Sequence, residues 1–467
     1  MNDRRRDLLV AVLALAGAVF AVLQAAVVPA LPDIDRALRA GPSSGTWILT
    51  VNLLATAVLT PVLGRMGDIH GKDRMLRVVM TALGLGTLVC ALAPSLPVML
   101  VGRVAQGAGG AVFPLAFGVL RDEFEGERVA GAIGLVSSLL GIGAGVGLVI
   151  AGPVIAALSW RWLFWLPLAV LVPVAGAVAR WVPGSPVRTP APVDLASAAL
   201  MVTGLSALLV AVSEASVWSL GSGRTLGLLG AGSLLVAAWV RHELASGDPL
   251  VDMRMMALRG VWTTNLAAFL LGVGMYASIA LVPALVELPR TTGVGFGGSV
   301  TAAGLFMVPT AAPQLIVGPF TGRVARRIGS RVQLLVGVAL MLAAYVALTI
   351  AHRHAWQLVV ATGALGLGLG FGLGALANLI VVAVGPRQTG VATAMNTVMR
   401  TLGGAFGAAI AAECLARGGS LDGDFAVAFA LCAGALALGV AAVLAIPGKP
   451  LRVDLRVARD HRALSQG

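Results

Sequence analysis

Charged groups are scarce in this chain, and the few that border or interrupt apolar stretches are its best candidates for chemistry. The segment Gly64–Arg74 reads GRMGDIHGKDR, and a weaker copy, GRVARRIGSR, occupies Gly322–Arg331. Both copies begin with Gly-Arg and carry another glycine seven residues later, but Asp68 of the first corresponds to Arg326 of the second. A carboxylate there can accept hydrogen bonds from an opposing helix end or pair with an arginine. We therefore expect a duplicated membrane protein whose halves differ at this point to change conformation as part of its function, rather than to serve only as a membrane anchor.

Two arginines, Arg103 and Arg400, stand inside apolar stretches. An arginine within hydrocarbon is costly and usually faces a cavity or a partner. Gln106 follows Arg103 by three residues, so hydrogen bonding to Gln106 and to neighbouring backbone is the structural alternative to a functional role. Both arginines are therefore candidates for the lining of a cavity.

The composition predicts that these charged groups are positioned by transmembrane helices. The chain is 58% hydrophobic and 12% charged, whereas a soluble domain carries about 25% charged residues. Fourteen apolar stretches lie between residues 8 and 446, and most approach the roughly 20 residues that cross a bilayer. We therefore expect an all-α polytopic membrane protein with fourteen transmembrane helices. The cysteines, Cys90, Cys414 and Cys432, are expected to pack as small hydrophobes.

The basic residues predict the topology. Alternate connections between the apolar stretches, counted from the N-terminus, hold 24 Lys and Arg, and the opposite connections hold 7. This asymmetry predicts that both termini are cytoplasmic and that the number of spans is even. The net charge of +12 is therefore a topology signal and not a sign of nucleic-acid binding. A multi-pass protein of a bacterial inner membrane is expected.

The repeated loop predicts the order of the domains. Its first copy follows the second apolar stretch and its second copy follows the tenth, so two extra spans separate two six-span halves. The expected parts are a six-helix bundle at 1–180, a linker with two additional helices at 181–260, a second six-helix bundle at 261–446 and a cytoplasmic tail at 447–467. Parallel repeats of this kind place a substrate path between the halves.

Several motifs together resemble the major facilitator superfamily. The resemblance lies in the loop residues Gly64, Asp68, Gly71, Lys72 and Arg74, in Arg103-x-x-Gln106-Gly107, in WRWLF at 160–164 and in TGVATAMNTVMRTLGG at 389–404. With fourteen spans, the chain is similar to the drug:proton antiporter branch. The resemblance implies a major facilitator fold, no enzymatic activity and no cofactor beyond a proton gradient. It implies a monomer that exports small hydrophobic or amphiphilic compounds by alternating access.

The resemblance also implies roles for individual residues. The loop around Asp68 would be a cytoplasmic gate that holds one access state, with Arg121 or Arg128 as possible partners of the acid; topology anchoring is the alternative for the basic residues. Arg103 would couple proton movement to substrate. The fifth stretch, dense in glycine, resembles an antiporter motif whose bend would lie at Gly152 and Pro153, although Ala156 and Ala157 replace its final glycines.

The first apolar stretch departs from the family pattern, because it has Gln24 and no acid where a Leu-Asp pair is often found. The proton carriers must then be sought among acids at helix ends, such as Asp33, Glu287 and Glu413. Amides inside the spans are candidates either for a cavity lining or for bridges between helices; these are Gln24, Asn52, Asn265, Gln314, Asn378 and Asn396. Such a cavity suits amphiphilic or aromatic substrates, and without a buried acid it does not favour simple cations.

Other functions are less consistent with the sequence. The pair His352 and His354 lacks a third ligand for a metal site, and the glycine run at 363–374 lies in an apolar stretch without a following Lys-Ser/Thr. Two alternatives to a drug exporter stay open: an exporter of narrow specificity for a metabolite or peptide-like compound, and a non-transporting receptor or assembly factor on the same scaffold.

Overall fold

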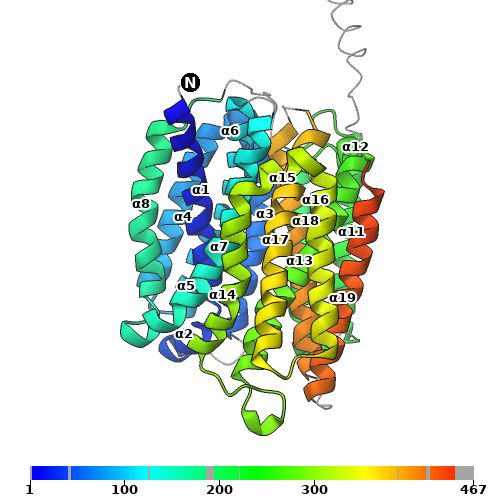
Figure 1. Cartoon of the computed structure of the whole chain (residues 1–467). Helices are drawn as coiled ribbons and strands as arrows, with labels where there is room; N and C mark the ends of the chain where they lie inside the picture. Colours follow the sequence, from blue (N-terminus) through cyan, green and yellow to red (C-terminus); the bar gives the residue numbers. More distant parts are fainter. Residues whose placement is uncertain are drawn as a thin grey trace, which may run out of the picture.

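The computed structural model describes residues 3–39, 44–124, 127–185, 194–219, 221–385, 388–416 and 421–447. Over these residues the chain is a bundle of long helices that run roughly along one direction (Figure 1). Thirteen of the described helices are long and apolar enough to cross a membrane. The protein is therefore a multi-pass membrane protein, as its composition predicts. The end of the bundle that carries the N-terminus is called the N-terminal end below.

The first half packs as one group of helices. α1 contacts α7 and α8, while α5 lies against both α3 and α4. The helices of this half are α1 (Asp3–Ala25), the short α2 (Leu31–Leu38), α3 (Ser44–His70), α4 (Lys72–Leu92), α5 (Leu96–Gly107), η1 (Ala108–Ala111), α6 (Val112–Glu123), α7 (Glu127–Ala157) and α8 (Trp162–Trp181). Helices α5, η1 and α6 form one continuous crossing from Leu96 to Glu123.

The second half repeats this arrangement. Its helices are α13 (Arg259–Glu287), η2 (Arg290–Thr292), α14 (Val300–Val317), η3 (Gly318–Phe320), α15 (Thr321–Ile328), α16 (Ser330–Ile350), α17 (Ala355–Ala383), α18 (Thr389–Ala416) and α19 (Leu421–Ala445). α13 packs on α18 and α19, and α16 packs on α17 and α19. The stretch expected at Val300–Phe320 is divided between α14 and η3, and α14 contains Pro309 and Pro313, which remove backbone hydrogen bonds.

Glycines bring neighbouring helices into backbone contact. A Cβ atom at Gly147 of α7 would lie 2.7 Å from the carbonyl oxygen of Val22 in α1. A Cβ atom at Gly368 of α17 would lie 2.5 Å from the carbonyl oxygen of Gly337 in α16. Small residues permit this close approach where apolar solvent gives no hydrophobic driving force between helices. Cys90, Cys414 and Cys432 are buried and none of the three forms a disulfide within the described residues, as expected of cysteines that pack as small hydrophobes.

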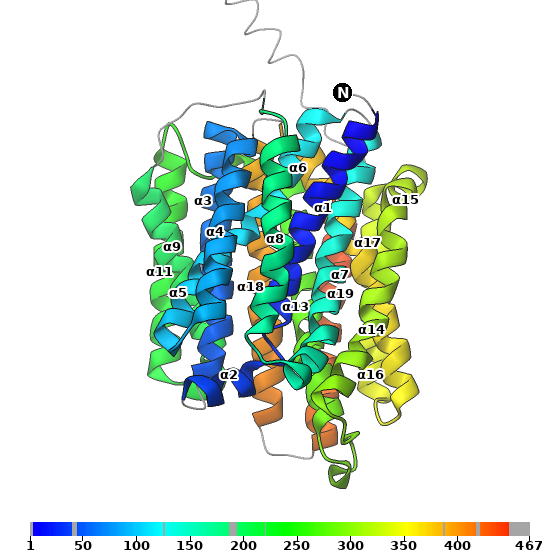
Figure 2. The ribbon, with the colours of Figure 1, turned by 90° about the vertical axis from the view of Figure 1, so that its left-hand side faces the viewer.

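Two further long helices stand at one side of the bundle, at the left of Figure 2. These are α9 (Leu195–Ser213) and α11 (Gly223–Ala245), joined through the short α10 (Ala215–Trp218), and α12 (Met253–Met256) leads from them to the second half. α9 contacts α3 of the first half and α18 of the second. The pair therefore bridges the halves. Of the predicted linker and tail, residues 186–193, 220 and 448–467 lie outside the described part of the chain.

A buried carboxylate holds the pair together. Oε1 of Glu243 accepts hydrogen bonds from the Trp239 ring N–H at 2.9 Å, from the Val251 N–H at 3.2 Å and from the Ser197 hydroxyl. One end of the pair is capped by Asp194, whose pKa is held below its ordinary value by the N–H of Ser197 and by the ring of His242. The loop that leads to α12 is thus fixed to α11.

Replacing Glu243 tests this account. Glu243→Ala would remove the acceptor of the Val251 N–H and of the Ser197 hydroxyl, and it would leave the Trp239 ring N–H only its 3.1 Å bond to the Ser197 hydroxyl oxygen. We therefore expect the free energy of unfolding to fall by about 2–3 kcal/mol. Glu243→Gln keeps an acceptor and is expected to cost less. The measurement is the midpoint of thermal unfolding in detergent, with Asp248→Ala, at an exposed position of the following loop, as the control. A midpoint for Glu243→Ala equal to that of the control would contradict the account.

Candidate functional site

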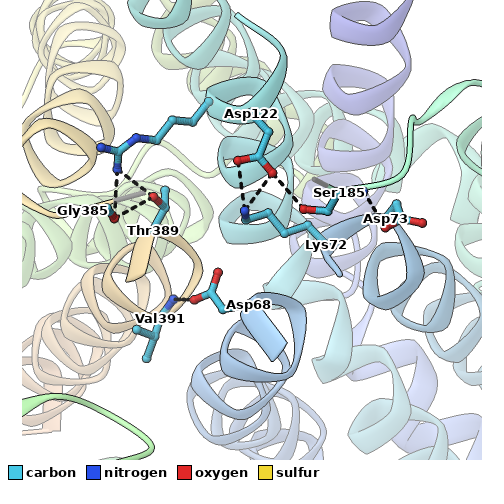
Figure 3. A network of polar contacts seen from close by, with 9 residues as sticks. Asp68, Lys72, Asp73, Asp122, Ser185, Gly385, Thr389 and Val391 are labelled. Carbon is cyan, nitrogen blue, oxygen red and sulfur yellow. Dashed lines mark hydrogen bonds and ion pairs between the residues drawn. The ribbon is translucent and has the colours of Figure 1, made fainter. Parts of the chain in front are cut away.

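The N-terminal end of the bundle is closed by a carboxylate that crosses between the halves. Asp68, near the end of α3, is 2% exposed and accepts a hydrogen bond of 3.1 Å from the backbone N–H of Val391 in the first turn of α18 (Figure 3). The first N–H groups of a helix lack partners inside the helix and carry the positive end of its dipole. The sequence left two kinds of partner open for Asp68, an opposing helix end or an arginine. The structure gives it a helix end.

Two glycines make this contact possible. A Cβ atom at Gly390 would lie 2.8 Å from Oδ1 of Asp68, and one at Gly64 would lie 3.0 Å from the carbonyl oxygen of Gly390. Either side chain would therefore hold α3 and α18 apart. Gly64 belongs to the predicted gate motif, whereas sequence reasoning did not single out Gly390, although it lies in the family-like stretch at 389–404.

Arg121 of α6 also joins the two halves at this end; its contacts and that of Asp68 with α18 are together called the seal below. Its guanidinium donates hydrogen bonds of 2.7 Å to the hydroxyl of Thr389 and 2.9 Å to the carbonyl oxygen of Val384. These acceptors lie at the start of α18 and just after α17. Arg121, proposed from the sequence as a partner of Asp68, instead binds the end of the opposite half directly.

The remaining gate residues separate into two kinds. Gly71 has a φ of 105°, a conformation that favours glycine, and it turns the chain from α3 into α4. Lys72 is buried and forms an ion pair of 2.8 Å with Asp122 of α6, which also accepts a hydrogen bond from the hydroxyl of Ser185 (Figure 3). Arg74 is exposed and takes no part in these contacts. Asp122 is a functional candidate that the sequence analysis did not identify.

The second copy of the loop packs in the equivalent place without the acid. A Cβ atom at Gly322 would lie 2.3 Å from the Cα atom of Gly131 in α7, and Gly329 has a φ of 82°. Asn378 of α17 donates a hydrogen bond of 3.3 Å to the carbonyl oxygen of Ala130. Each loop thus contacts the start of the fifth long helix of the other half. In the first copy the contact includes the Asp68 carboxylate, and Arg326 stands at the corresponding position of the second.

Arg103 lies in a buried polar cluster on α5. Its Nε donates to the carbonyl oxygen of Ile48 at 3.1 Å, and its Nη1 donates to Oε1 of Gln106 at 2.9 Å. The Asn52 amide donates to the carbonyl oxygen of Arg103 at 3.0 Å. Gly107 packs against Ala55, where a Cβ atom would come within 2.4 Å of the alanine side chain. The expected bonds to Gln106 and to backbone are therefore present.

Several cavities are lined by residues of both halves, and two of them border Arg103 and Arg400. The larger has a volume of about 160 Å³ and is lined from both halves by Gln24, Asn52, Arg103, Met275, Tyr276 and Ala408, among others. The smaller, about 20 Å³, is lined by Phe113, Ser137, Leu140, Asn396 and Arg400, among others. Leu140 of α7 lines both. The structure thus places the buried Arg103 and the partly buried Arg400 beside cavities, together with three of the predicted amides.

Of the other amides, Asn265 makes a contact between helices, whereas Gln314 bonds within its own helix and lines a further cavity between the halves. Asn265 of α13 accepts a hydrogen bond of 2.9 Å from Asn396, and Gln314 donates to the carbonyl oxygen of Thr310 at 2.8 Å within α14. A Cβ atom at Gly152 of α7 would lie 2.7 Å from the Thr301 hydroxyl of α14. Pro153 lies inside α7 and is exposed.

The three acids predicted as proton carriers lie away from these cavities. Asp33 forms an ion pair with Arg36 in the short α2. Glu287 is exposed at the end of α13, and Glu413 is partly buried near the end of α18. None of them lines either cavity. Within the described residues, no group of three or more His, Cys, Asp or Glu could hold a metal ion.

Comparison with known proteins places this geometry in a family. The profile of the Major Facilitator Superfamily matches residues 13–288 and 264–465. The chain belongs to this superfamily. The membership predicted from the motifs around Asp68 and Arg103 is therefore confirmed, and the protein is a membrane transporter by family and not an enzyme.

Curated relatives of this superfamily protein are transport or export proteins by name. The multidrug transporter protein MdtP of Bacillus subtilis is 26% identical over 85% of this chain and 73% of its own length. The cephamycin export protein CmcT of Amycolatopsis lactamdurans is 30% identical over 82% of this chain and 79% of its own length. The human organic anion transporter MFSD10 (TETRAN) has a TM-score of 0.65 at 16% identity, over 95% of this chain and 100% of that one, a likeness of fold alone.

The glycine at the seal offers a direct test. Gly390→Ala places a methyl group against the Asp68 carboxylate, so we expect the N-terminal end to open more often. A cysteine introduced as Thr393→Cys, in the lining of the smaller cavity, should then react about tenfold faster with a membrane-impermeant maleimide in inverted vesicles, a shift of about 1.4 kcal/mol. Gly434→Ala, in open space on α19, is the control. An unchanged labelling rate in Gly390→Ala would contradict this account of the seal.

Proposed function

We propose that the protein is a proton-coupled exporter of hydrophobic or amphiphilic compounds that works by alternating access. In this proposal it has fourteen membrane crossings, with α14, η3 and α15 supplying the one that is interrupted, and both termini are cytoplasmic in a bacterial inner membrane. It belongs to the drug:proton antiporter branch and acts as a monomer without a cofactor.

The bond between Asp68 and the start of α18 carries the proposal. It ties the halves together at the end that the charge asymmetry assigns to the cytoplasm. The larger cavity lies between the halves and is lined mainly by apolar side chains. In the proposed cycle, breaking the Asp68 and Arg121 contacts would open this cavity toward the cytoplasm for loading, and restoring them would close it again.

The relatives support export as the direction. MdtP and the Mycobacterium tuberculosis protein Stp, 26% identical over 83% of this chain, are named as multidrug transport or resistance proteins. A narrow-specificity exporter is the second candidate, because the relative that is 30% identical is named for the export of one class of compound, cephamycin. A panel of chemically unrelated dyes and antibiotics would distinguish the two. A receptor on the same scaffold would show no flux.

Neutralising Asp68 tests the gate. Asp68→Asn keeps the shape of the side chain but removes its charge from the first turn of α18, and charge-assisted hydrogen bonds contribute about 1.5–3 kcal/mol. We expect flux driven by a pH gradient in proteoliposomes to fall by about tenfold or more, with normal insertion. Asp248→Asn should transport normally. Flux of Asp68→Asn at the level of the parent protein would rule out the gate.

Arg103 tests the coupling. Arg103→Ala is expected to lower uphill accumulation driven by a pH gradient by about tenfold or more, as the loss of a buried charged group's interactions would predict. Downhill equilibration of the same dye should persist, because the halves and their seal are intact. Arg180→Ala, at an exposed position at the end of α8, is the control. Undiminished uphill accumulation by Arg103→Ala would exclude a coupling role.

A further inference from the structure

The charges around the two cavities indicate the kind of compound that they bind. Their lining residues include two arginines, Arg103 and Arg400, and neither an aspartate nor a glutamate. We propose that the site between the halves binds an organic anion with an apolar body, and that Arg400 and Tyr276 hold its acidic group. This inference rests on the exporter function proposed above, for which it names the substrate class.

Arg400 differs from the other buried basic side chains in its contacts. Lys72 is paired with Asp122, and Arg103 donates to a backbone carbonyl and to an amide. Within the described residues, no hydrogen bond or ion pair involves the guanidinium of Arg400, which is only partly buried and borders the smaller cavity. An unpaired cation in a low-dielectric interior is unfavourable. A bound carboxylate or sulfonate would supply the missing countercharge through two parallel N–H···O bonds.

Tyr276 places a second donor beside Arg400. Its ring packs over Gly404, one helical turn after Arg400 on α18, where a Cβ atom would lie 2.5 Å from the ring. A Cβ atom at Gly272, one helical turn before Tyr276 on α13, would lie 2.2 Å from the carbonyl oxygen of Arg400, so the two helices are in backbone contact beside these side chains. Tyr276 lines the larger cavity, Arg400 lines the smaller, and Leu140 lines both. The acidic group of a ligand would therefore bind between Arg400 and Tyr276, beside Leu140, with the tyrosine hydroxyl as a further donor.

The larger cavity suits the rest of such a ligand. Its walls are mostly apolar, including Val28, Leu53 and Ile279, so an aromatic or aliphatic body would be buried there. Arg103 is in the same lining and adds positive charge. A cationic compound of the same shape would meet two arginines and no acid, so charge repulsion would select against it.

The test compares three naphthalene compounds of one shape and different charge. Radiolabelled 2-naphthoate is bound to the purified full-length protein in lipid nanodiscs, and naphthalene-2-carboxamide and 2-naphthylmethylammonium serve as competitors. We expect the anion to bind at least about tenfold more tightly than either competitor. Arg400→Gln should weaken naphthoate binding by about tenfold or more while leaving the carboxamide unchanged, Arg400→Lys should restore part of the loss, and Arg180→Gln should have no effect.

Each outcome decides the inference independently of export. Failure of the native protein to bind naphthoate, equal binding of all three compounds, or unchanged naphthoate binding by Arg400→Gln would overturn the anion site. If naphthoate binds through Arg400 but no compound is moved in proteoliposomes, the anion site stands and the exporter function fails. If neutral dyes are exported and naphthoate is not bound, export stands and the anion site fails.

Discussion

The closure of the N-terminal end centres on one short contact, the Asp68 carboxylate against the first turn of α18. A single charge at a helix end can serve as a reversible connection because the helix carries unpaired donors there whether or not the acid is present. Breaking the contact exposes those groups to water at the membrane surface, where water can replace the carboxylate. The energy difference between the bound and separated forms is thereby kept to a few kcal/mol, in the range that a ligand or a proton can reverse.

This contact explains what the difference between the two loop copies, Asp68 in the first and Arg326 in the second, does to the structure. Gly322 meets Gly131 by backbone packing, whereas Gly64 and Gly390 bring a charged group within bonding distance. Packing between small residues depends mainly on fit, but an ionisable contact also depends on charge. The loop copy with Asp68 is therefore suited to a contact that can be made and broken. The copy with Gly322 is suited to a permanent packing contact. Lys72 and Asp122 hold the first loop's turn on its own half, so that Asp68 is presented from a fixed base.

Much of this organisation could be predicted from the sequence, because membrane crossings and loop charges leave strong local signals. The helices, the family and the burial of Arg103 beside Gln106 follow from runs of apolar residues and from short motifs. The contact of Asp68 with Val391 could not be derived, since it joins positions 323 residues apart and depends on the absence of a side chain at Gly390. Asp122 was missed for a similar reason: an acid at the end of an apolar stretch resembles an ordinary solvated residue until the fold brings Lys72 to it.

The helices α9 and α11 add a constraint that a simple two-part machine lacks. α9 touches α3 and α18, which belong to different halves, and Asp252, beside α12, accepts a hydrogen bond of 3.1 Å from Gln388 just before α18. If the halves separate as in the proposed cycle, this pair can move with only one of them, and the bond to Gln388 favours the second. In that case α9 would slide along α3, and the contact between them is made by aliphatic side chains such as Val58 and Met201. The additional pair would then act as a guide that restricts the directions in which α3 can move relative to α18.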